Sequence, residues 1–126
     1  MPSRSISDLN PSAARKCQQF LALANERLRE RGLQIFLTCT YRSQVEQDQL
    51  YAQGRTKPGP IVTWTRRSMH SERRAWDVAF KGLKAPVDLY RGHDAEWELL
   101  GQWAKELAIK WGGDYKKNRD RAHFYI

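Results

Sequence analysis

Cysteine is scarce in this sequence of 126 residues, which contains only Cys17 and Cys39. Because neither belongs to a Cys-x-x-Cys pair, the sequence indicates neither a disulfide framework nor a zinc site built from thiolates. We interpret both side chains as buried, apolar thiols.

Long hydrophobic runs are missing as well. No stretch approaches the about 18 consecutive apolar residues that indicate a membrane-spanning helix, so we expect no such span. Residues 1–8 (MPSRSISD) contain no apolar core of the kind that a secretory signal peptide has. We therefore expect the protein to accumulate in the cytoplasm of the cell that makes it, and to be released by another agent if it acts outside.

Positive charge, by contrast, is abundant. The 22 Lys and Arg residues exceed the 14 Asp and Glu residues and give a net charge of +8. Such a chain attracts polyanions, among them nucleic acid and carboxylate-rich polymers such as peptidoglycan. No nucleic-acid-binding motif is recognisable, so a basic nucleic-acid-binding domain is the weaker interpretation. Arg66, Arg67, Arg73 and Arg74 form either a solvated basic edge or a rim that attracts acidic substrates.

Helix signals occur at three places. Asn10 followed by a proline is typical of a helix start, and apolar residues then recur at helical spacing until Gly32. Ser43 and Glu46 form a capping box, which predicts a second helix that runs to Gly54. A third helix is predicted to begin at Asp94, as its cap, and to carry apolar residues at helical spacing up to Ala108.

Strands are predicted over residues 33–40, 74–81 and 122–126, with a loop over 55–63 and a brief extended piece over 64–67. In the second strand, the alternation places Asp77 on one face and the apolar Trp76, Val78 and Phe80 on the other. This mixture of elements predicts a small α+β fold, with residues 1–126 as a single domain.

The five tryptophans mostly fit core positions, and Trp97 and Trp103 do so most clearly. Trp64 and Trp76 are the candidates for lining a groove, although the core is the preferred interpretation for both.

Two histidines and two aspartates lie in two short segments, one with His70 and Asp77 and one with Asp120 and His123. If the strands that carry Asp77 and His123 pair, both side chains point from one sheet face, and His70 can approach from the preceding loop. Two imidazoles and one carboxylate can bind zinc and leave a fourth position for water. Asp120, in the turn before the last strand, can then accept a proton from that water.

Spacing alone leaves a second interpretation open. One or two of these histidines could be structural residues, hydrogen-bonded near a helix cap or in a salt bridge. His93 stands in a predicted turn, so we expect an exposed loop residue there rather than a ligand.

Three ordered blocks of residues resemble those of the LAS/M15 zinc peptidases, in particular the branch of bacteriophage L-alanyl-D-glutamate endolysins. The blocks are Thr40-Tyr41-Arg42-Ser43 with Glu46-Gln47 and residues 50–56; Ser68-x-His70-x4-Ala75-x-Asp77; and Trp111-Gly112-Gly113-Asp114 through Asp120-x-x-His123-Phe124. Together they run from residue 40 to the end of the chain. Each block alone is only modest evidence for the family, but the three blocks in this order are specific to it.

The resemblance implies a role for each matching residue. The ligands of one zinc ion per chain would be His70, Asp77 and His123. Asp120 takes the place of the catalytic acid and base, and Arg42 that of the arginine that steadies the substrate and the developing oxyanion. Ser68 occupies a position that can hydrogen-bond the substrate. The family fold is an antiparallel sheet packed by about three helices (LAS/hedgehog-like).

Three positions depart from the family pattern. Arg73 stands where the family usually has glycine, and an arginine there would be strained if the backbone needs a positive φ. Tyr115 and Ala122 stand where the endolysin branch often has tryptophan and proline, which could alter a wall of the substrate site.

The resemblance implies a peptidoglycan hydrolase, a phage endolysin that cleaves the stem peptide between L-alanine and D-glutamate with zinc-activated water. A D-Ala-D-Ala carboxypeptidase of the same family is the nearest alternative, and a metal-bound but inactive wall-binding module is another. We expect a monomer that binds peptidoglycan stem peptides and no nucleic acid. A holin would release it from the cytoplasm of the host bacterium to the cell wall.

Overall fold

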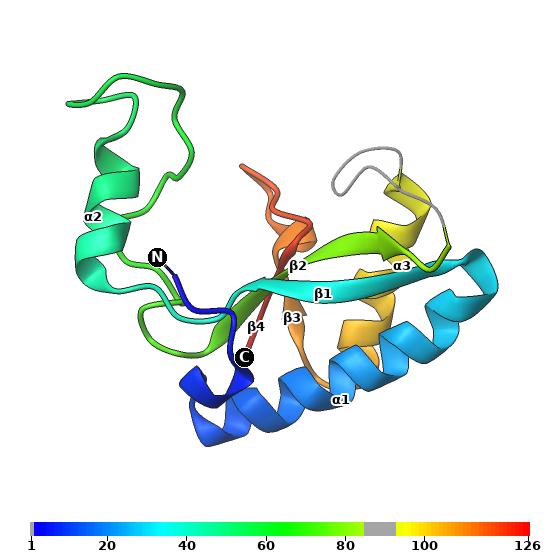
Figure 1. The fold of residues 1–126 in the computed structure, drawn as a ribbon. Coiled ribbons are helices and arrows are strands. Elements are labelled where there is room, and N and C mark those ends of the chain that lie inside the picture. The colour runs from blue at the N-terminus through cyan, green and yellow to red at the C-terminus, as the bar shows by residue number, and fades with distance from the viewer. Residues whose placement is uncertain (1, 85–92) are drawn as a thin grey trace.

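The computed structural model describes residues 2–84 and 93–126. Its helices are α1 (Pro11–Leu28), α2 (Gln44–Ala52) and α3 (Asp94–Glu106), and its strands are β1 (Leu33–Cys39), β2 (Ala75–Gly82), β3 (Lys110–Trp111) and β4 (His123–Tyr125). Short 3-10 turns lie at Ile6–Asp8, Arg29–Arg31 and Gly112–Asp114. Figure 1 shows the arrangement of these elements along the chain.

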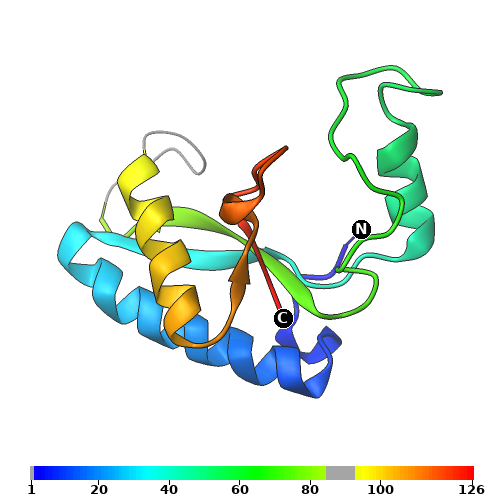
Figure 2. The same cartoon turned by 180° about the vertical axis from the view of Figure 1, so that it is seen from behind.

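The strands form one antiparallel sheet in the order β1-β2-β4-β3. Helices α1 and α3 lie along one face of this sheet (Figures 1 and 2). Phe20 of α1 packs against Phe124 with ring centroids 4.6 Å apart, and Trp97 of α3 packs against Phe80 at 4.6 Å. This face of the sheet therefore forms the hydrophobic core, and the opposite face is available for polar side chains.

The predicted alternation of β2 is confirmed. Trp76, Val78 and Phe80 belong to the core between the sheet and the helices. Because successive side chains of a strand point to opposite faces, Asp77 points away from that core. On β4, Phe124 is likewise in the core, and His123 lies on the face of Asp77.

The predicted helix starts are confirmed for α1 and α2. The side chain of Asn10 accepts a hydrogen bond from the backbone N–H of Ala13 at 2.8 Å. Ser43 and Glu46 make both hydrogen bonds of a capping box. Gly32 follows the 3-10 turn Arg29–Arg31 after α1 in the left-handed conformation, with φ of 69°, which glycine adopts without steric cost.

Other predictions were wrong in detail. The cap of α3 is His93 rather than Asp94, which is the first residue of the helix, and the helix ends at Glu106. His93 is not an exposed loop residue: 12% of its side chain is exposed, and its ring lies 4.9 Å from that of Phe80. Residues 64–67 contain bends rather than a strand. Strand β3 was not predicted, because two residues are too few to show a period.

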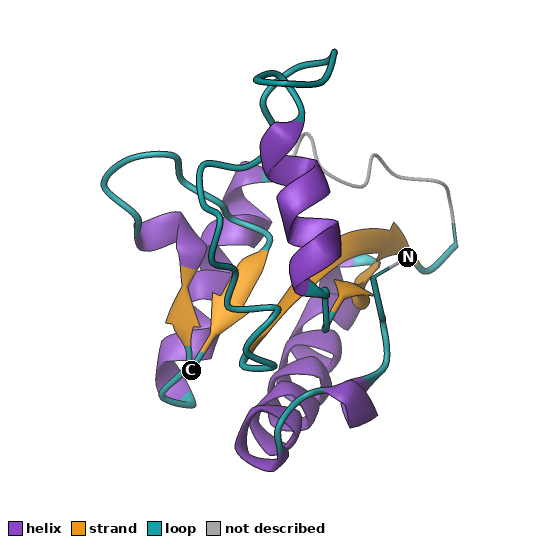
Figure 3. Ribbon diagram, turned by 90° about the vertical axis from the view of Figure 1, so that its left-hand side faces the viewer, coloured by secondary structure: helices purple, strands orange, loops and turns teal. Residues whose placement is uncertain are grey.

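Helix α2 lies apart from the layer of α1 and α3, at one end of the sheet (Figure 1). The loop over residues 53–74 returns from α2 to the start of β2 (Figure 3). The fold thus places this segment beside the polar face of the sheet. Within residues 2–84 and 93–126, no helix has the length and apolar character that crossing a membrane requires.

Candidate metal centre

The candidate centre begins as a row of side chains across three strands. Asp77 of β2 is the register partner of His123 on β4, and on its other side it is the partner of Cys39 on β1. Side chains of directly opposed residues in an antiparallel pair lie on the same face and within contact distance. The sheet itself therefore brings Cys39, Asp77 and His123 together.

His70 reaches this row from a turn before β2. Backbone hydrogen bonds within residues 68–74 close the turn, among them those from Arg73 N–H to the His70 carbonyl and from Ser71 N–H to the Ser68 carbonyl. The hydroxyl oxygen of Ser68 accepts a hydrogen bond from His70 N–H at 3.1 Å. Ser68 is buried and holds the backbone of His70, and its hydroxyl proton can still be donated to another group.

At Arg73, where the family usually has glycine, the turn has the positive φ that glycine favours. Arg73 has a φ of 61°, in the left-handed region. Its guanidinium lies 3.9 Å from the centre of the Tyr41 ring and donates a hydrogen bond to the Asp8 carbonyl at 2.9 Å. These contacts offset the strain of a non-glycine residue at positive φ, which is about 1–2 kcal/mol, and the turn keeps its shape.

Asp77 lies between the two imidazoles. Its Oδ2 is 3.2 Å from Nε2 of His70, and its Oδ1 is 2.9 Å from Nδ1 of His123. The two imidazole rings are 5.1 Å apart, edge to face. The structure thus brings together the three predicted ligands and confirms that the strands of Asp77 and His123 pair.

The charges of this cluster depend on one another. Burial disfavours the charged form of Asp77, but hydrogen bonds from His123 and His70 outweigh burial and hold the pKa of the carboxyl well below its usual range. Burial likewise disfavours the imidazolium of His70, but the hydrogen bonds to Asp77 and Cys39 raise the pKa of His70 to about 10. Without a metal, a proton therefore takes the place of a cation beside the Asp77 carboxylate.

The donor set fits a zinc ion. Zinc prefers imidazole nitrogen and carboxylate oxygen in tetrahedral geometry, with bonds that set neighbouring ligand atoms about 3.4 Å apart. The separations of 3.2 and 2.9 Å from Asp77 to the two histidines are close to this spacing. The other nitrogen of His70, Nδ1, lies 3.4 Å from the carbonyl oxygen of Thr40, which is the kind of partner that orients a metal-binding imidazole.

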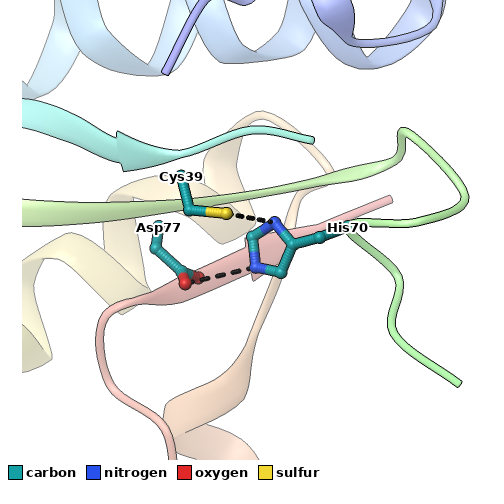
Figure 4. A group of neighbouring side chains, drawn as sticks. All are labelled: Cys39, His70 and Asp77. Atoms are coloured by element: carbon teal, nitrogen blue, oxygen red, sulfur yellow. Dashed lines mark hydrogen bonds and ion pairs between the residues drawn. The ribbon is translucent and has the colours of Figure 1, made fainter. Parts of the chain in front are cut away.

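Among the described residues, two sets of three possible ligand atoms lie within 4.8 Å of one another: Cys39 with His70 and Asp77, and Asp77 with Asp120 and His123. Asp77 belongs to both. Cys39 Sγ faces Nδ1 of His70 at 3.5 Å, whereas Asp77 faces Nε2 (Figure 4). Cys39 and Asp77 thus use different nitrogens of one ring, so we place Cys39 behind His70 rather than among the ligands.

Sequence reasoning missed the position of Cys39. In β1, Leu33, Ile35 and Leu37 face the core, and regular alternation would send Cys39 to the same face. A register irregularity between Leu37 and Cys39 instead aligns Cys39 with Asp77. Bulges of this kind re-aim side chains next to functional sites. The prediction that both thiols are buried is confirmed, but only Cys17 lies in the hydrophobic core.

Asp120 lies in the loop before β4, as predicted. Although the residue is exposed at the edge of the pocket, partial burial of its carboxyl group and the negative charge of Asp77 raise the pKa of Asp120. Gly112 makes this position possible, because a Cβ there would collide with the carbonyl oxygen of Asp120. Asp120 N–H in turn donates to the Gly112 carbonyl at 3.0 Å.

Arg42 lies on the other side of the cluster. Its Nη1 donates to Oε1 of Gln47 at 2.9 Å, and its Nη2 donates to Cys39 Sγ at 3.7 Å. No ion pair within the described part of the chain involves Arg42, so its charge is not neutralised there by a carboxylate. Its Nε is buried and has no partner among the described residues. A salt bridge between Arg42 and Glu46 is therefore not the role of this arginine.

Gln47 belongs to the first block that resembles the family, but no role was predicted for it from the sequence. It is fully buried, and its Nε2 donates to the carbonyl of Thr65 at 2.7 Å. It therefore links Arg42 to the loop after α2. Its position three residues before Leu50, on one face of the helix, was the available signal.

One pocket of about 760 Å³ is lined by the side chains of Arg42, Gln47, Ser68, His70, Asp77, Asp120 and His123. One wall contains Gln47 and Leu50 of α2 with residues 62–65 and 67–69, and the other contains Tyr115 and residues 117–120. The Tyr115 ring lies 6.4 Å from that of His123. Tyr115, one of the three positions that depart from the family pattern, is thus part of the pocket wall.

The basic residues near the pocket are mostly engaged elsewhere. Arg74 contacts Glu72 and the carbonyl of Ile126, and Arg66 lies over the ring of Tyr51. Arg119 and Arg121 pair with Glu98 and Asp94. Of the four arginines from the basic edge, only Arg67 lines the pocket. A solvated edge therefore describes most of this group.

A family model and a characterised relative match the chain. A model of the peptidase family M15_4, described as D-alanyl-D-alanine carboxypeptidase, matches residues 62–126. The chain is 35% identical over 125 residues to the peptidoglycan L-alanyl-D-glutamate endopeptidase CwlK of Bacillus subtilis strain 168. That match covers 93% of this chain and 72% of the relative.

Solved structures share the fold. The L-Ala D-Glu endopeptidase ChiX of Serratia marcescens matches with a TM-score of 0.68 at 19% identity, over 100% of this chain and 88% of that one. A variant of the vancomycin-resistance D,D-pentapeptidase VanY from a VanB-type cassette, solved with Zn(II), matches with a TM-score of 0.59 at 12% identity, over 94% and 72%. These likenesses confirm the predicted α+β fold.

Proposed function

The chain belongs to the M15 peptidase family, and on this premise we propose that it is a zinc-dependent peptidoglycan endopeptidase that cleaves the stem peptide between L-alanine and D-glutamate. The observation that carries the proposal is the convergence of two imidazoles and two carboxylates in one pocket beside an arginine without an acidic partner among the described residues. The bond is the one named for the relative from Bacillus subtilis.

We assign His70, Asp77 and His123 as the residues that hold one zinc ion per chain. The ion would supply a Lewis acid and lower the pKa of a bound water to about 7, so that hydroxide is available near neutral pH. Loading the site requires His70 to lose the proton that it shares with Asp77, because only a neutral imidazole can be a ligand.

Asp120 is the proposed general base and acid. Its carboxyl group lies within 4.8 Å of ligand atoms of Asp77 and His123 but belongs to a loop, so it can reach a water in the same pocket. It accepts the proton of the attacking water and passes it to the leaving amine. Burial and Asp77 raise its pKa, which makes it a better proton acceptor than an ordinary aspartate.

Arg42 is the proposed group that stabilises the oxyanion. Gln47 holds its guanidinium from one side, at 2.9 Å, and Cys39 lies on another. A fixed positive charge in a partly water-excluded pocket stabilises the negative charge that develops on the carbonyl oxygen. Ser68, which also lines the pocket, can donate its hydroxyl proton to the substrate.

The test is digestion of purified sacculi by the zinc-loaded protein, followed by mass spectrometry of the new amino termini. The proposal expects D-glutamate, or its amidated form, as the new terminus, and loss of the reaction with a chelator. Release of D-alanine alone would support a D-Ala-D-Ala carboxypeptidase instead, which is the activity in the description of the family model. No release of either product would contradict the proposed activity.

The more specific role of a phage endolysin rests on the resemblance of the three motif blocks. The two L-alanyl-D-glutamate endopeptidases compared above come from bacteria. If the chain is an endolysin, it stays in the host cytoplasm until a holin opens the membrane. Its production in a bacterium should then cause lysis only when a pore-forming partner is produced with it, and lysis without that partner would contradict this role.

A further inference from the structure

The pocket wall after α2 carries apolar side chains that the core does not use. Trp64 is 62% exposed and Val62 is 52% exposed, and both line the pocket that contains Arg42 and His70. The prediction that Trp64 belongs to the core was therefore wrong. Exposed apolar side chains that are grouped at a ligand-binding groove are a mark of an interaction site.

The position of Trp64 is supported by its neighbours. The guanidinium of Arg55 lies 3.8 Å from the centre of the Tyr51 ring and 5.8 Å from that of Trp64. The same guanidinium donates to the carbonyls of Tyr51 at 2.6 Å and of Thr63 at 3.2 Å. These hydrogen bonds connect the loop to α2. Arg55 and Tyr51 therefore support the position of the Trp64 indole.

Gln47 fixes the same loop at its base. Its Nε2 donates to the carbonyl of Thr65 and to the hydroxyl of Thr63, at 2.7 and 3.3 Å, while its Oε1 accepts from Arg42. One buried amide thus connects the proposed oxyanion group to the residues on either side of Trp64. An occupant of the pocket that contacts Arg42 can therefore extend along the wall to the indole.

Charge is unevenly distributed over the pocket lining. Val62, Thr63 and Trp64 form an uncharged end of the pocket, whereas the rest of the lining carries Arg42, Arg67, Lys117 and Asp120. The substrate has the same asymmetry about the proposed scissile bond. The carboxylates of the stem peptide begin at D-glutamate, and on the other side a single alanine joins the peptide to the muramyl sugar of the glycan.

We propose that Trp64 and Val62 form a subsite for the muramyl sugar, so that the protein acts on stem peptides still attached to the glycan. This inference rests on the proposed function. The apolar face of a sugar ring packs against an indole, and hydroxyls such as that of Thr63 accept or donate hydrogen bonds at its edge. The charged part of the lining, with Arg42, Arg67 and Lys117, then faces the D-glutamate side, where the carboxylates lie.

The first test compares kcat/KM for two synthetic substrates, the stem peptide alone and the same peptide on N-acetylmuramic acid. The wild-type protein should prefer the muramyl peptide, and Trp64→Ala should reduce the ratio of the two constants about tenfold. Trp64→Phe should restore part of the ratio. Val45→Ala is the matched control, because Val45 is 66% exposed on α2 and does not line the pocket.

A second measurement does not depend on catalysis. The chelated protein is titrated with N-acetylmuramoyl-L-alanyl-D-glutamate and with L-alanyl-D-glutamate. We expect tighter binding of the muramyl compound, and loss of that difference in Trp64→Ala. If Trp64→Ala binds both compounds more weakly than wild type by the same factor, Trp64 contacts the peptide rather than the sugar, and the inference is overturned. If wild type cleaves neither substrate but retains the difference in affinity, the proposed activity fails and the sugar subsite stands.

Discussion

Asp77 and His123 are register partners on adjacent antiparallel strands, with His123 Nδ1 at 2.9 Å from Asp77 Oδ1. This contact connects two parts of the chain 46 residues apart, and each residue alternates with core residues that pack against the helices. The same strand pairing that builds the core thus positions two of the proposed ligands. Metal binding and folding should therefore be coupled.

The first prediction concerns His123. Replacing it with alanine removes one of three proposed ligands, so zinc content measured by elemental analysis should fall from one ion per chain to well below one. His93→Ala is the matched control, since His93 packs on Phe80 and does not line the pocket. Unchanged zinc content in His123→Ala would remove this residue from the ligand set.

The second prediction concerns Asp120. Asp120→Asn should keep zinc and fold but lose cleavage of sacculi by about 10²–10⁴-fold, which is the usual contribution of a general base. Asp114→Asn is the control, because Asp114 lies in the preceding 3-10 turn, is exposed and pairs with Lys105 at 2.9 Å. Full activity of Asp120→Asn, measured by the release of new amino termini, would eliminate Asp120 as the base.

The third prediction concerns the backbone at Arg73, which has a φ of 61°. Arg73→Ala loses the contacts with Tyr41 and Asp8 but keeps the strain, whereas Arg73→Gly loses the same contacts and removes the strain. The glycine variant should therefore be more stable than the alanine variant by about 1 kcal/mol. Urea denaturation of both variants measures the difference, and an equally stable pair would show that the turn is not strained.

The fourth prediction is a pH dependence of the metal-free protein. The pKa of His70 is raised from 6.5 to about 10, so its protonation contributes stability fully present below pH 6.5 and lost as the pH rises toward 10. The pKa of Asp77 is lowered from 3.8, so its contribution is present above that pH and lost as the pH falls below it. The melting temperature of the chelated protein should thus be highest between these limits.

The zinc-loaded protein is the control for this pH dependence. When His70 is a ligand, its imidazole is neutral and has no imidazolium proton to lose. The decrease in melting temperature between pH 6.5 and 10 should therefore be smaller than in the chelated protein. Parallel curves for the two forms would contradict the assignment of His70 as a ligand. Proton release on zinc addition at pH 7 is expected for the same reason.

Much of the site was predictable because regular alternation determines it. Asp77 stands between core residues of a strand, and His123 beside Phe124, so their common face followed from the period of two. The positions of His70 and Asp120 followed from their places in a turn before each strand. The fold class followed from helix caps, such as those at Asn10 and Ser43, that act locally.

Features that break the period were not predictable. Cys39 reaches the site only because of a register irregularity in β1, and no residue type in the strand indicates that irregularity. Trp64 lies in a segment without periodicity, so its hydrophobicity suggested the core although the fold exposes it. Gln47 is buried because Arg42 and Thr65 satisfy its amide, and these partners become visible only in three dimensions.

The most direct test of the metal site is a crystal structure of the zinc-loaded protein with anomalous diffraction recorded at the zinc absorption edge. We predict one peak per chain at about 2.0–2.2 Å from His70, Asp77 and His123, with Asp120 in the same pocket and Cys39 outside bonding distance. A peak bonded to Cys39, or none near the two histidines, would contradict the assignment.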